Sequence, residues 1–186
     1  MIALIWTLIG FFCGSLPFSA WIARLALKTD IASIGDGNPG GANVWKAGGR
    51  LWAVLAVLLD GFKGATPVGI AYFVINLHGW ELIPVALAPL LGHIFSPFLK
   101  FRGGKGLSTT FGIWLGTTLW LGPTILGLSL FVWREILKSD HASVIAGLLT
   151  LTMAVSVYEH DLVFLSIGLL NSLLLGWSFS RSNNVV

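Results

Sequence analysis

Long apolar runs with very few charges constrain this chain more than any other feature of its sequence. Of the 186 residues, 55% are hydrophobic and 10% are charged, whereas a soluble domain carries roughly 25% charged residues. A membrane-spanning helix needs about 20 consecutive, mainly apolar residues. The length therefore allows about six or seven crossings of a bilayer and leaves no room for a sizeable aqueous domain. We expect one polytopic membrane domain over residues 1–186.

Six apolar runs, bounded by charges or by Gly and Pro clusters, are the candidate spans. They cover residues 2–26, 51–73, 82–99, 107–133, 142–157 and 162–179. The fourth run is long for one span and short for two, and Leu121-Gly122-Pro123 lies in its middle. Because a Gly-Pro pair breaks a helix and can turn the chain, this run contains either one helix or two short ones.

The distribution of basic residues decides between these two arrangements. With two helices in the fourth run, every Lys and Arg except Lys63 lies on one side of the membrane, whereas one helix moves Arg134 and Lys138 to the other side. Cytoplasmic loops carry an excess of Lys and Arg. We therefore expect an all-α integral membrane protein with about seven transmembrane helices, its N-terminus outside and its C-terminus in the cytoplasm.

Several other classes of protein are disfavoured by the composition. The net charge of +3 comes from basic residues that are too few and too scattered to follow a nucleic-acid backbone. A single cysteine, Cys13, excludes an intrachain disulfide. His78, His141 and His160 lack the spacing of metal ligands. We expect no nucleic-acid partner, no metal and no cofactor.

Two Gly-rich loops on the predicted cytoplasmic side are unusually rich in polar residues for so apolar a chain. The first reads IGDGNPGGANVWK over residues 34–46, and the second reads KFRGGKG over residues 100–106. Glycines let backbone N–H groups turn toward an anion, and a helix that starts just after Gly106 would add the positive charge of its N-terminus. Lys105 supplies a full charge. The two loops together predict a phosphate site, although the second alone could be a flexible hinge that touches anionic lipid and the first alone a plain surface loop.

Among the ionisable residues inside the predicted spans, Asp60, Lys63 and His93 are candidates for function. Asp60 and Lys63 are three residues apart and so share one face of a helix. Charges at bilayer depth are costly unless they are paired or line a cavity, so this pair is either functional or an ion pair that fixes helix packing. His93, at the inner end of its span, could act as an acid or base, could donate to phosphate, or could simply pack at the helix end.

Five segments carry a family resemblance. They read GSLPFS over residues 14–19, GDGNPGGANV over 35–44, DGFKG over 60–64, GH over 92–93 and FRGGKG over 101–106. In this order and spacing they resemble the bacterial acyl-phosphate:glycerol-3-phosphate acyltransferase family, the PlsY type. The resemblance implies a seven-helix enzyme of the cytoplasmic membrane. It would transfer an acyl group from acyl phosphate to the 1-hydroxyl of glycerol-3-phosphate and so make lysophosphatidic acid for phospholipid synthesis.

The resemblance also implies roles for individual residues. Lys105, together with the backbone of Gly103 and Gly104, would hold phosphate, and Ser143 would hydrogen-bond the acceptor substrate. The other candidates for substrate binding are Gly37, Asn38, Gly40, Asn43, Lys46, His93, Arg102 and Gly106. Besides the two substrates, the expected partner of the protein is membrane lipid.

The chain departs from the family pattern at both ends. In the first loop the family's Ser is Asp36, its Thr is Ala42 and its Arg is Lys46. A carboxylate beside phosphates is unfavourable unless it is protonated, turned away or bridged by a cation. One accommodation makes Asp36 catalytic, as the acceptor of the proton from the attacking hydroxyl. The family's last helix ends in Arg-His-x-x-Asn-Ile, whereas residues 177–182 lack that His and Asn.

These departures leave two alternatives beside the leading hypothesis. One is a paralogue that is non-catalytic or uses another acceptor, and that binds acyl phosphate or phospholipid. The other is a small anion transporter, which is less favoured because the sequence has no detectable inverted repeat.

Overall fold

The computed structural model describes residues 1–183, and the regular structure within them is helical. The longer helices are α1 (Ile2–Ser15), α2 (Phe18–Ala26), α3 (Gly41–Lys46), α4 (Arg50–Gly69), α5 (Leu82–Ile94), α6 (Leu107–Thr118), α7 (Leu121–Leu137), α8 (Asp140–Glu159) and α9 (Leu162–Asn183). Short turns between them are η1 (Ile31–Ser33), the π-helical η2 (Ile70–Val74), η3 (Gly79–Glu81) and η4 (Pro97–Leu99).

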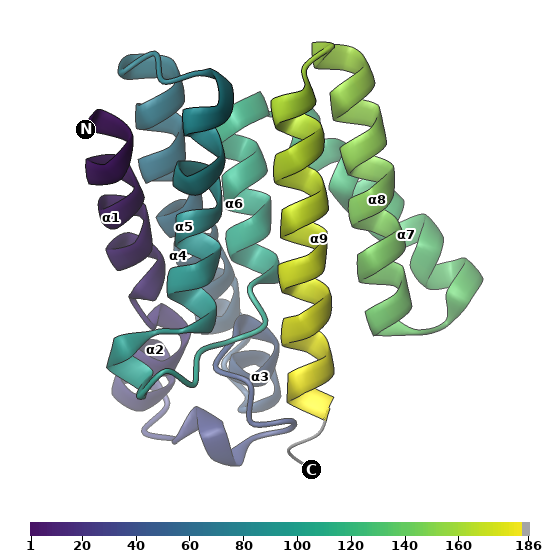
Figure 1. Ribbon diagram of the computed structural model, residues 1–186. Helices are drawn as coiled ribbons and strands as arrows, with labels where there is room; N and C mark the ends of the chain where they lie inside the picture. Colours follow the sequence, from purple (N-terminus) through teal and green to yellow (C-terminus); the bar gives the residue numbers. More distant parts are fainter. Residues whose placement is uncertain (184–186) are drawn as a thin grey trace.

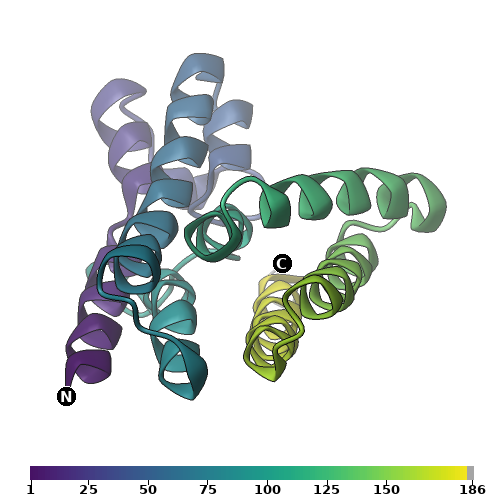
Figure 2. The same ribbon diagram turned by 90° about the horizontal axis from the view of Figure 1, so that it is seen from above.

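The long helices form a bundle with the connecting loops at its two ends (Figure 1). Helix α4 packs against α6, α1 packs against α5, and α9 packs against both α5 and α8. Seen from above, α7 lies side-on and leads away from α6, and α8 then returns alongside α9 (Figure 2). Helices α2 and α3 lie at the same end of the bundle as the C-terminal end of α9, whereas the N-terminus lies at the opposite end (Figure 1).

The surface of this bundle suits a lipid environment. Five stretches are long and apolar enough to cross a membrane, namely Ile2–Ala26, Arg50–Val74, Gly79–Leu99, Asp140–Glu159 and Leu162–Arg181. Large apolar side chains also point outward, and Leu4, Phe131 and Leu173 are 64%, 70% and 70% exposed. Apolar patches on this scale are unusual on monomeric soluble proteins. The prediction of an all-α membrane protein is thereby confirmed.

The predicted number of spans is matched only in part. Helices α6 and α7 are present as two separate helices, but they contain 12 and 17 residues, fewer than the roughly 20 needed for a full perpendicular crossing. The count of seven spans and their orientation stay predictions.

The first apolar run was expected to form one helix and instead forms two. Helix α1 ends at Ser15 and α2 begins at Phe18, because Pro17 has no N–H to continue the helical hydrogen bonds. The break leaves the carbonyl oxygen of Leu16 without its helical donor. This oxygen accepts a hydrogen bond of 2.7 Å from Lys63 Nζ of α4.

The break in the fourth run lies slightly earlier than predicted. The chain turns at Leu119, whose φ is 52°, and α7 already begins at Leu121. Gly122 and Pro123 therefore lie inside the first turn of α7. Proline is tolerated there because the first N–H groups of a helix have no intrahelical acceptor.

Glycines let α4 and α6 approach each other closely, which holds together the two loops that lead into these helices. A Cβ atom on Gly112 of α6 would collide with the carbonyl oxygen of Gly61 in α4. On the opposite side of the contact, a Cβ on Gly64 would lie 2.5 Å from the carbonyl oxygen of Thr109. Backbone thus packs directly on backbone along this interface.

We expect Gly112→Ala to lower the free energy of unfolding by about 1–3 kcal/mol, because an extra atom in a packed interior forces neighbouring backbone to move. Titration with SDS in mixed micelles measures this quantity. Gly127→Ala is the matched control, since a Cβ there meets only a Phe111 ring atom at 3.9 Å. Parent-like stability of Gly112→Ala would contradict the close packing.

Candidate active site

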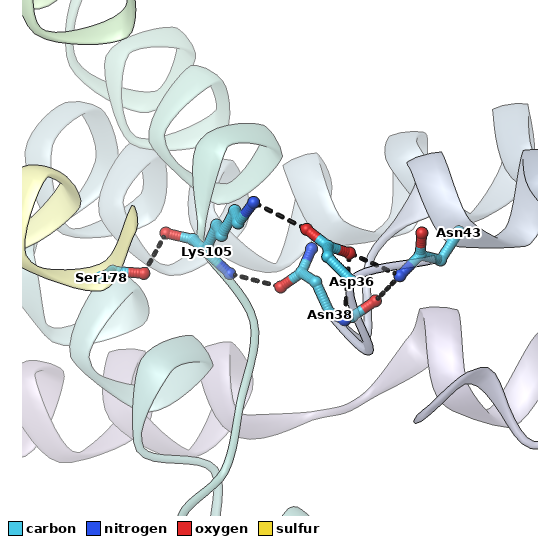
Figure 3. Close-up of polar contacts among 5 residues, drawn as sticks. All are labelled: Asp36, Asn38, Asn43, Lys105 and Ser178. Atoms are coloured by element: carbon cyan, nitrogen blue, oxygen red, sulfur yellow. Dashed lines mark hydrogen bonds and ion pairs between the residues drawn. The ribbon is translucent and has the colours of Figure 1, made fainter. Parts of the chain in front are cut away.

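The two Gly-rich loops, far apart in the sequence, contact each other directly (Figure 3). Lys105 Nζ lies 2.7 Å from Asp36 Oδ2. The backbone N–H of Lys105 donates to Asn38 Oδ1 at 2.9 Å. Both the charged group and the main chain of Lys105 are thus held by the first loop.

The Asp36 carboxylate is surrounded by hydrogen-bond donors of its own loop. Its Oδ1 atom accepts from Asn43 Nδ2 at 2.8 Å and from the Asn38 N–H at 3.3 Å. Asn43 Nδ2 also donates to the Asn38 carbonyl oxygen at 2.9 Å. Positive φ angles of 60° at Gly35 and 69° at Gly37 let the backbone turn around this carboxylate.

These contacts keep Asp36 ionised. Partial burial raises the pKa of the Asp36 carboxyl, but the hydrogen bonds from Lys105, Asn43 and Asn38 outweigh it and lower that pKa to about 2. The ion pair with Lys105 therefore persists near neutral pH and weakens only as the pH falls through about 2. A carboxylate with so low a pKa is a weak base.

The end of α9 also packs on Lys105. Ser178 Oγ donates to the Lys105 carbonyl oxygen at 3.0 Å (Figure 3). The Phe179 ring lies 4.9 Å from Lys105 Nζ, and the His141 ring stacks on it with a centroid distance of 6.0 Å. Phe179 thereby joins the Lys105 loop to the start of α8.

A cavity of about 690 Å³ opens where these segments meet. Of the predicted site residues it is lined by Asp36, Gly37, Asn38, Arg102, Gly103, Gly104 and Lys105. Its charged lining consists of four basic residues, Arg24, Arg102, Lys105 and Arg181, and two acidic ones, Asp30 and Asp36. The excess of positive charge suits an anionic ligand. Within residues 1–183, no cluster of three His, Cys, Asp or Glu residues is placed to bind a metal ion.

Sequence reasoning missed Arg24, Ser178 and Arg181 in this cavity. Arg24 is at the end of α2, and its position in the sequence indicated only topology. Ser178 and Arg181 belong to the segment that departs from the family pattern, where they stand in place of the family's His and Asn. A basic residue at the end of a helix is the signal that could have identified Arg24 and Arg181, whereas Ser178 carries no such signal.

The backbone of Gly103 and Gly104 is arranged differently from the prediction. Their N–H groups donate to the carbonyl oxygens of Ile94 and His93, at 3.0 and 3.2 Å, and so do not point at an anion. A Cβ on Gly103 would collide with the His93 carbonyl oxygen, and one on Gly104 would lie 2.5 Å from His93 Nε2. These glycines are needed for close packing on the end of α5. His93 itself is buried beneath the loop.

The other candidates do not line the cavity. Helix α6 begins directly after Gly106, as predicted, with Gly106 at a φ of 93°. The Lys46 side chain folds over Gly35, and Gly40 packs against Asn38. Ser143 is buried in the first turns of α8, where its Oγ donates to the Ser139 carbonyl oxygen at 2.6 Å.

Asp60 and Lys63 form a separate buried cluster. Lys63 Nζ lies 2.8 Å from Asp60 Oδ1, and both side chains are 3% exposed or less. Ser19 Oγ of α2 donates to Asp60 Oδ2 at 2.6 Å. With the Leu16 carbonyl oxygen on Lys63, the cluster ties α4 to the broken helix α1–α2. It does not line the cavity.

The sequence is similar to that of known proteins. Residues 4–184 match the family model described as glycerol-3-phosphate acyltransferase. The glycerol-3-phosphate acyltransferase 1 of Thermotoga maritima is 43% identical over 122 residues, which are 63% of this chain and 59% of that protein. The glycerol-3-phosphate acyltransferase of Coxiella burnetii is 35% identical over 147 residues, which are 79% of this chain and 74% of that protein.

A solved structure resembles the whole bundle. The crystal structure of PlsY, an integral membrane glycerol 3-phosphate acyltransferase, in its glycerol 3-phosphate form has a TM-score of 0.84 and 27% sequence identity. The match covers 99% of this chain and 91% of that chain. Against three of the curated relatives, the chain spans only 59%, 64% and 60% of their lengths.

Proposed function

The chain belongs to the glycerol-3-phosphate acyltransferase family, and on that premise we propose that it transfers an acyl group from acyl phosphate to glycerol-3-phosphate. The oxygen of the 1-hydroxyl attacks the acyl carbon and forms the ester bond of lysophosphatidic acid. The bond between the acyl carbon and the phosphate oxygen breaks, and inorganic phosphate leaves with the electron pair. The hydroxyl proton passes to the departing phosphate, so that hydrogen phosphate is released and atoms and charges balance.

The observation that carries this proposal is the cationic cavity between the two Gly-rich loops. Each phosphate group carries about 1.5–2 negative charges near neutral pH, and four basic side chains line the cavity. Because acyl phosphate is already activated, the protein has mainly to bind two phosphates, exclude water and align the reacting atoms. Lys105 and Arg102 come from one loop, and Arg24 and Arg181 approach from α2 and α9.

The roles of single residues follow from this arrangement. Lys105 binds phosphate through its ammonium group, with Arg102 beside it in the same loop. Asn38 positions Lys105 by accepting its backbone N–H. The family resemblance also assigns Ser143 to the acceptor substrate, although its side chain is buried, donates to the Ser139 carbonyl oxygen and does not line the cavity.

The same premise gives a membrane arrangement. The chain crosses the cytoplasmic membrane of the cell seven times as a single domain, with α6 and α7 as two short crossings, its N-terminus outside and its C-terminus inside. The start of α1 and the end of α9 lie at opposite ends of the bundle (Figure 1), which suits an odd number of crossings. The site then faces the cytoplasm, on the side that holds the basic residues.

A reporter placed after Val186 and one inserted near His78 are therefore expected on opposite sides of the membrane, the first in the cytoplasm. Val186 lies outside the described residues, whereas His78 precedes η3. Accessibility to an impermeant thiol reagent, or a paired phosphatase and fluorescent-protein fusion, measures the side. Cytoplasmic exposure of both reporters would discard the seven-span arrangement.

The activity is tested with the purified chain in detergent, acyl phosphate and glycerol-3-phosphate, by following lysophosphatidic acid and inorganic phosphate. Formation of both in equal amounts supports the proposal. Binding of acyl phosphate without turnover would instead indicate the non-catalytic paralogue. Phosphate release that requires a different alcohol would indicate an altered acceptor.

A further inference from the structure

The Asp36 carboxylate forms an ion pair with Lys105, the cation that a phosphate ligand would need. It receives the Lys105 ammonium on one oxygen, at 2.7 Å, and the side-chain amide of Asn43 and N–H of Asn38 on the other. Donors gathered around negatively charged oxygens are also what a protein offers to a bound phosphate. The first loop thus already provides Lys105 with an anionic partner.

We propose that Asp36 is an internal anion that competes with phosphate for Lys105, lowers the affinity of the cavity for phosphate, and so promotes departure of the phosphate product. The part of this inference that concerns the product rests on the proposed function. The competition itself concerns only the binding of a phosphate group and holds whether or not the chain turns over.

Electrostatics make the competition unavoidable. A phosphate bound to Lys105 Nζ would bring its oxygens close to the Asp36 carboxylate, and like charges a few ångströms apart repel each other strongly in a partly buried site. Lys105 is 20% and Asp36 35% exposed, so water screens this repulsion only in part. Either Asp36 moves away from Lys105 or phosphate binds weakly. Return of the carboxylate to Lys105 then opposes rebinding.

The surroundings of Asp36 favour this role over that of a proton acceptor. Oδ1 already accepts two hydrogen bonds within the loop and Oδ2 accepts one from Lys105. An acceptor for a hydroxyl proton needs a free lone pair aimed into the cavity and a basicity close to neutral. A neutral residue such as serine at this position would leave the Lys105 charge available to phosphate.

The test is calorimetric titration of the full-length protein in detergent with inorganic phosphate. Asp36→Asn is the main variant, because an amide oxygen can still accept from Asn43 and from the Asn38 N–H while the charge is removed. We expect this variant to bind phosphate about tenfold more tightly than the parent. The charge-assisted hydrogen bond between Lys105 and the partly exposed Asp36 is then absent and no longer competes with phosphate. Asp36→Ser, which removes the carboxylate and most of the side chain, should act in the same direction.

Asp30→Asn is the matched control. Asp30 lines the same cavity and accepts a hydrogen bond from the Ala32 N–H, but it does not contact Lys105. Removing the Asp30 charge alters the electrostatic potential in the cavity but leaves the ion pair of Lys105 intact. Because this charge is screened by water, we expect the phosphate affinity to change at most roughly twofold. An equal gain in Asp30→Asn and Asp36→Asn would overturn the specific competition.

Turnover provides a second, separable readout. In an active enzyme, the inhibition constant for inorganic phosphate should fall in Asp36→Asn in parallel with the calorimetric constant. Phosphate binding that is unchanged or weaker in both well-folded Asp36 variants would overturn the inference, even if the parent is active. Tighter binding in a chain that shows no turnover would support the competition and refute only the proposed function.

Discussion

Replacing Lys63 with Met is expected to lower the free energy of unfolding by about 3–5 kcal/mol, the cost of leaving one partner of a buried ion pair without its counter-charge. Asp60 would keep only the hydrogen bond from Ser19, and the Leu16 carbonyl oxygen would lose its donor. Asp60→Asn should cost a similar amount, because it leaves an ammonium group buried in the bundle. Titration with SDS in mixed micelles gives both values.

The double variant separates a structural pair from an unrelated loss of packing. Replacing Asp60 with Asn and Lys63 with Met together removes both charges, so the double variant should be more stable than either single variant by roughly 1–3 kcal/mol, within the range of coupling energies measured for contacting residues. Lys138→Met is a useful comparison, since its ion pair with Glu135 is exposed and such pairs contribute about 0–1 kcal/mol. Additive losses in the double variant would show that the pair is not coupled.

Sequence spacing was sufficient to place Asp60 and Lys63 on one helix face, because positions i and i+3 always meet on an α-helix. It was not sufficient to identify their other partners. Ser19 and Leu16 lie more than 40 positions away in the sequence, and they reach the pair only because the chain breaks at Pro17. Pro17 in the middle of residues 2–26 was a signal for a break, but the run was defined by hydropathy, which is insensitive to a single proline.

In the candidate site, too, the sequence indicated local features but not the contacts between distant residues. The Gly-rich loops and Lys105 could be recognised from composition and from the family resemblance, and α6 does begin after Gly106. The contact between Asp36 and Lys105 joins residues 69 positions apart, and no local rule predicts such a pair. The N–H groups of Gly103 and Gly104 were expected to face an anion, but tertiary packing on the end of α5 engages them instead.

Membrane spans were predicted from length and hydropathy, which describe five of the helical stretches well. The fourth run is the exception. Helices α6 and α7 are short, and α7 is seen side-on from above where α8 and α9 are seen closer to end-on (Figure 2). The inclination of a helix depends on the neighbours it packs against, so the sequence window alone could not indicate it.

Replacing Lys105 with Met is expected to lower kcat/KM for acyl phosphate and glycerol-3-phosphate roughly ten- to hundredfold, since a charged hydrogen bond to phosphate is worth about 1.5–3 kcal/mol. Methionine keeps most of the aliphatic stem that packs near Phe179 and removes only the charge. Lys100→Met is the matched control, because Lys100 belongs to the same loop but is exposed and does not line the cavity. Steady-state kinetics with both substrates varied measure the change.

Because Lys105 is paired with Asp36, its substitution has a second effect on the cavity. Loss of the ammonium group removes its attraction for phosphate and also leaves the Asp36 carboxylate without its counter-charge in the cavity. Combining Asp36→Asn with Lys105→Met should therefore recover part of the lost kcat/KM, because the repulsion disappears while the attraction stays absent. If Asp36 instead accepts the hydroxyl proton, the double variant should be slower than Lys105→Met alone, by a further factor of about 10²–10⁴. Activity of Lys105→Met within a factor of two of the parent would remove Lys105 from the site altogether.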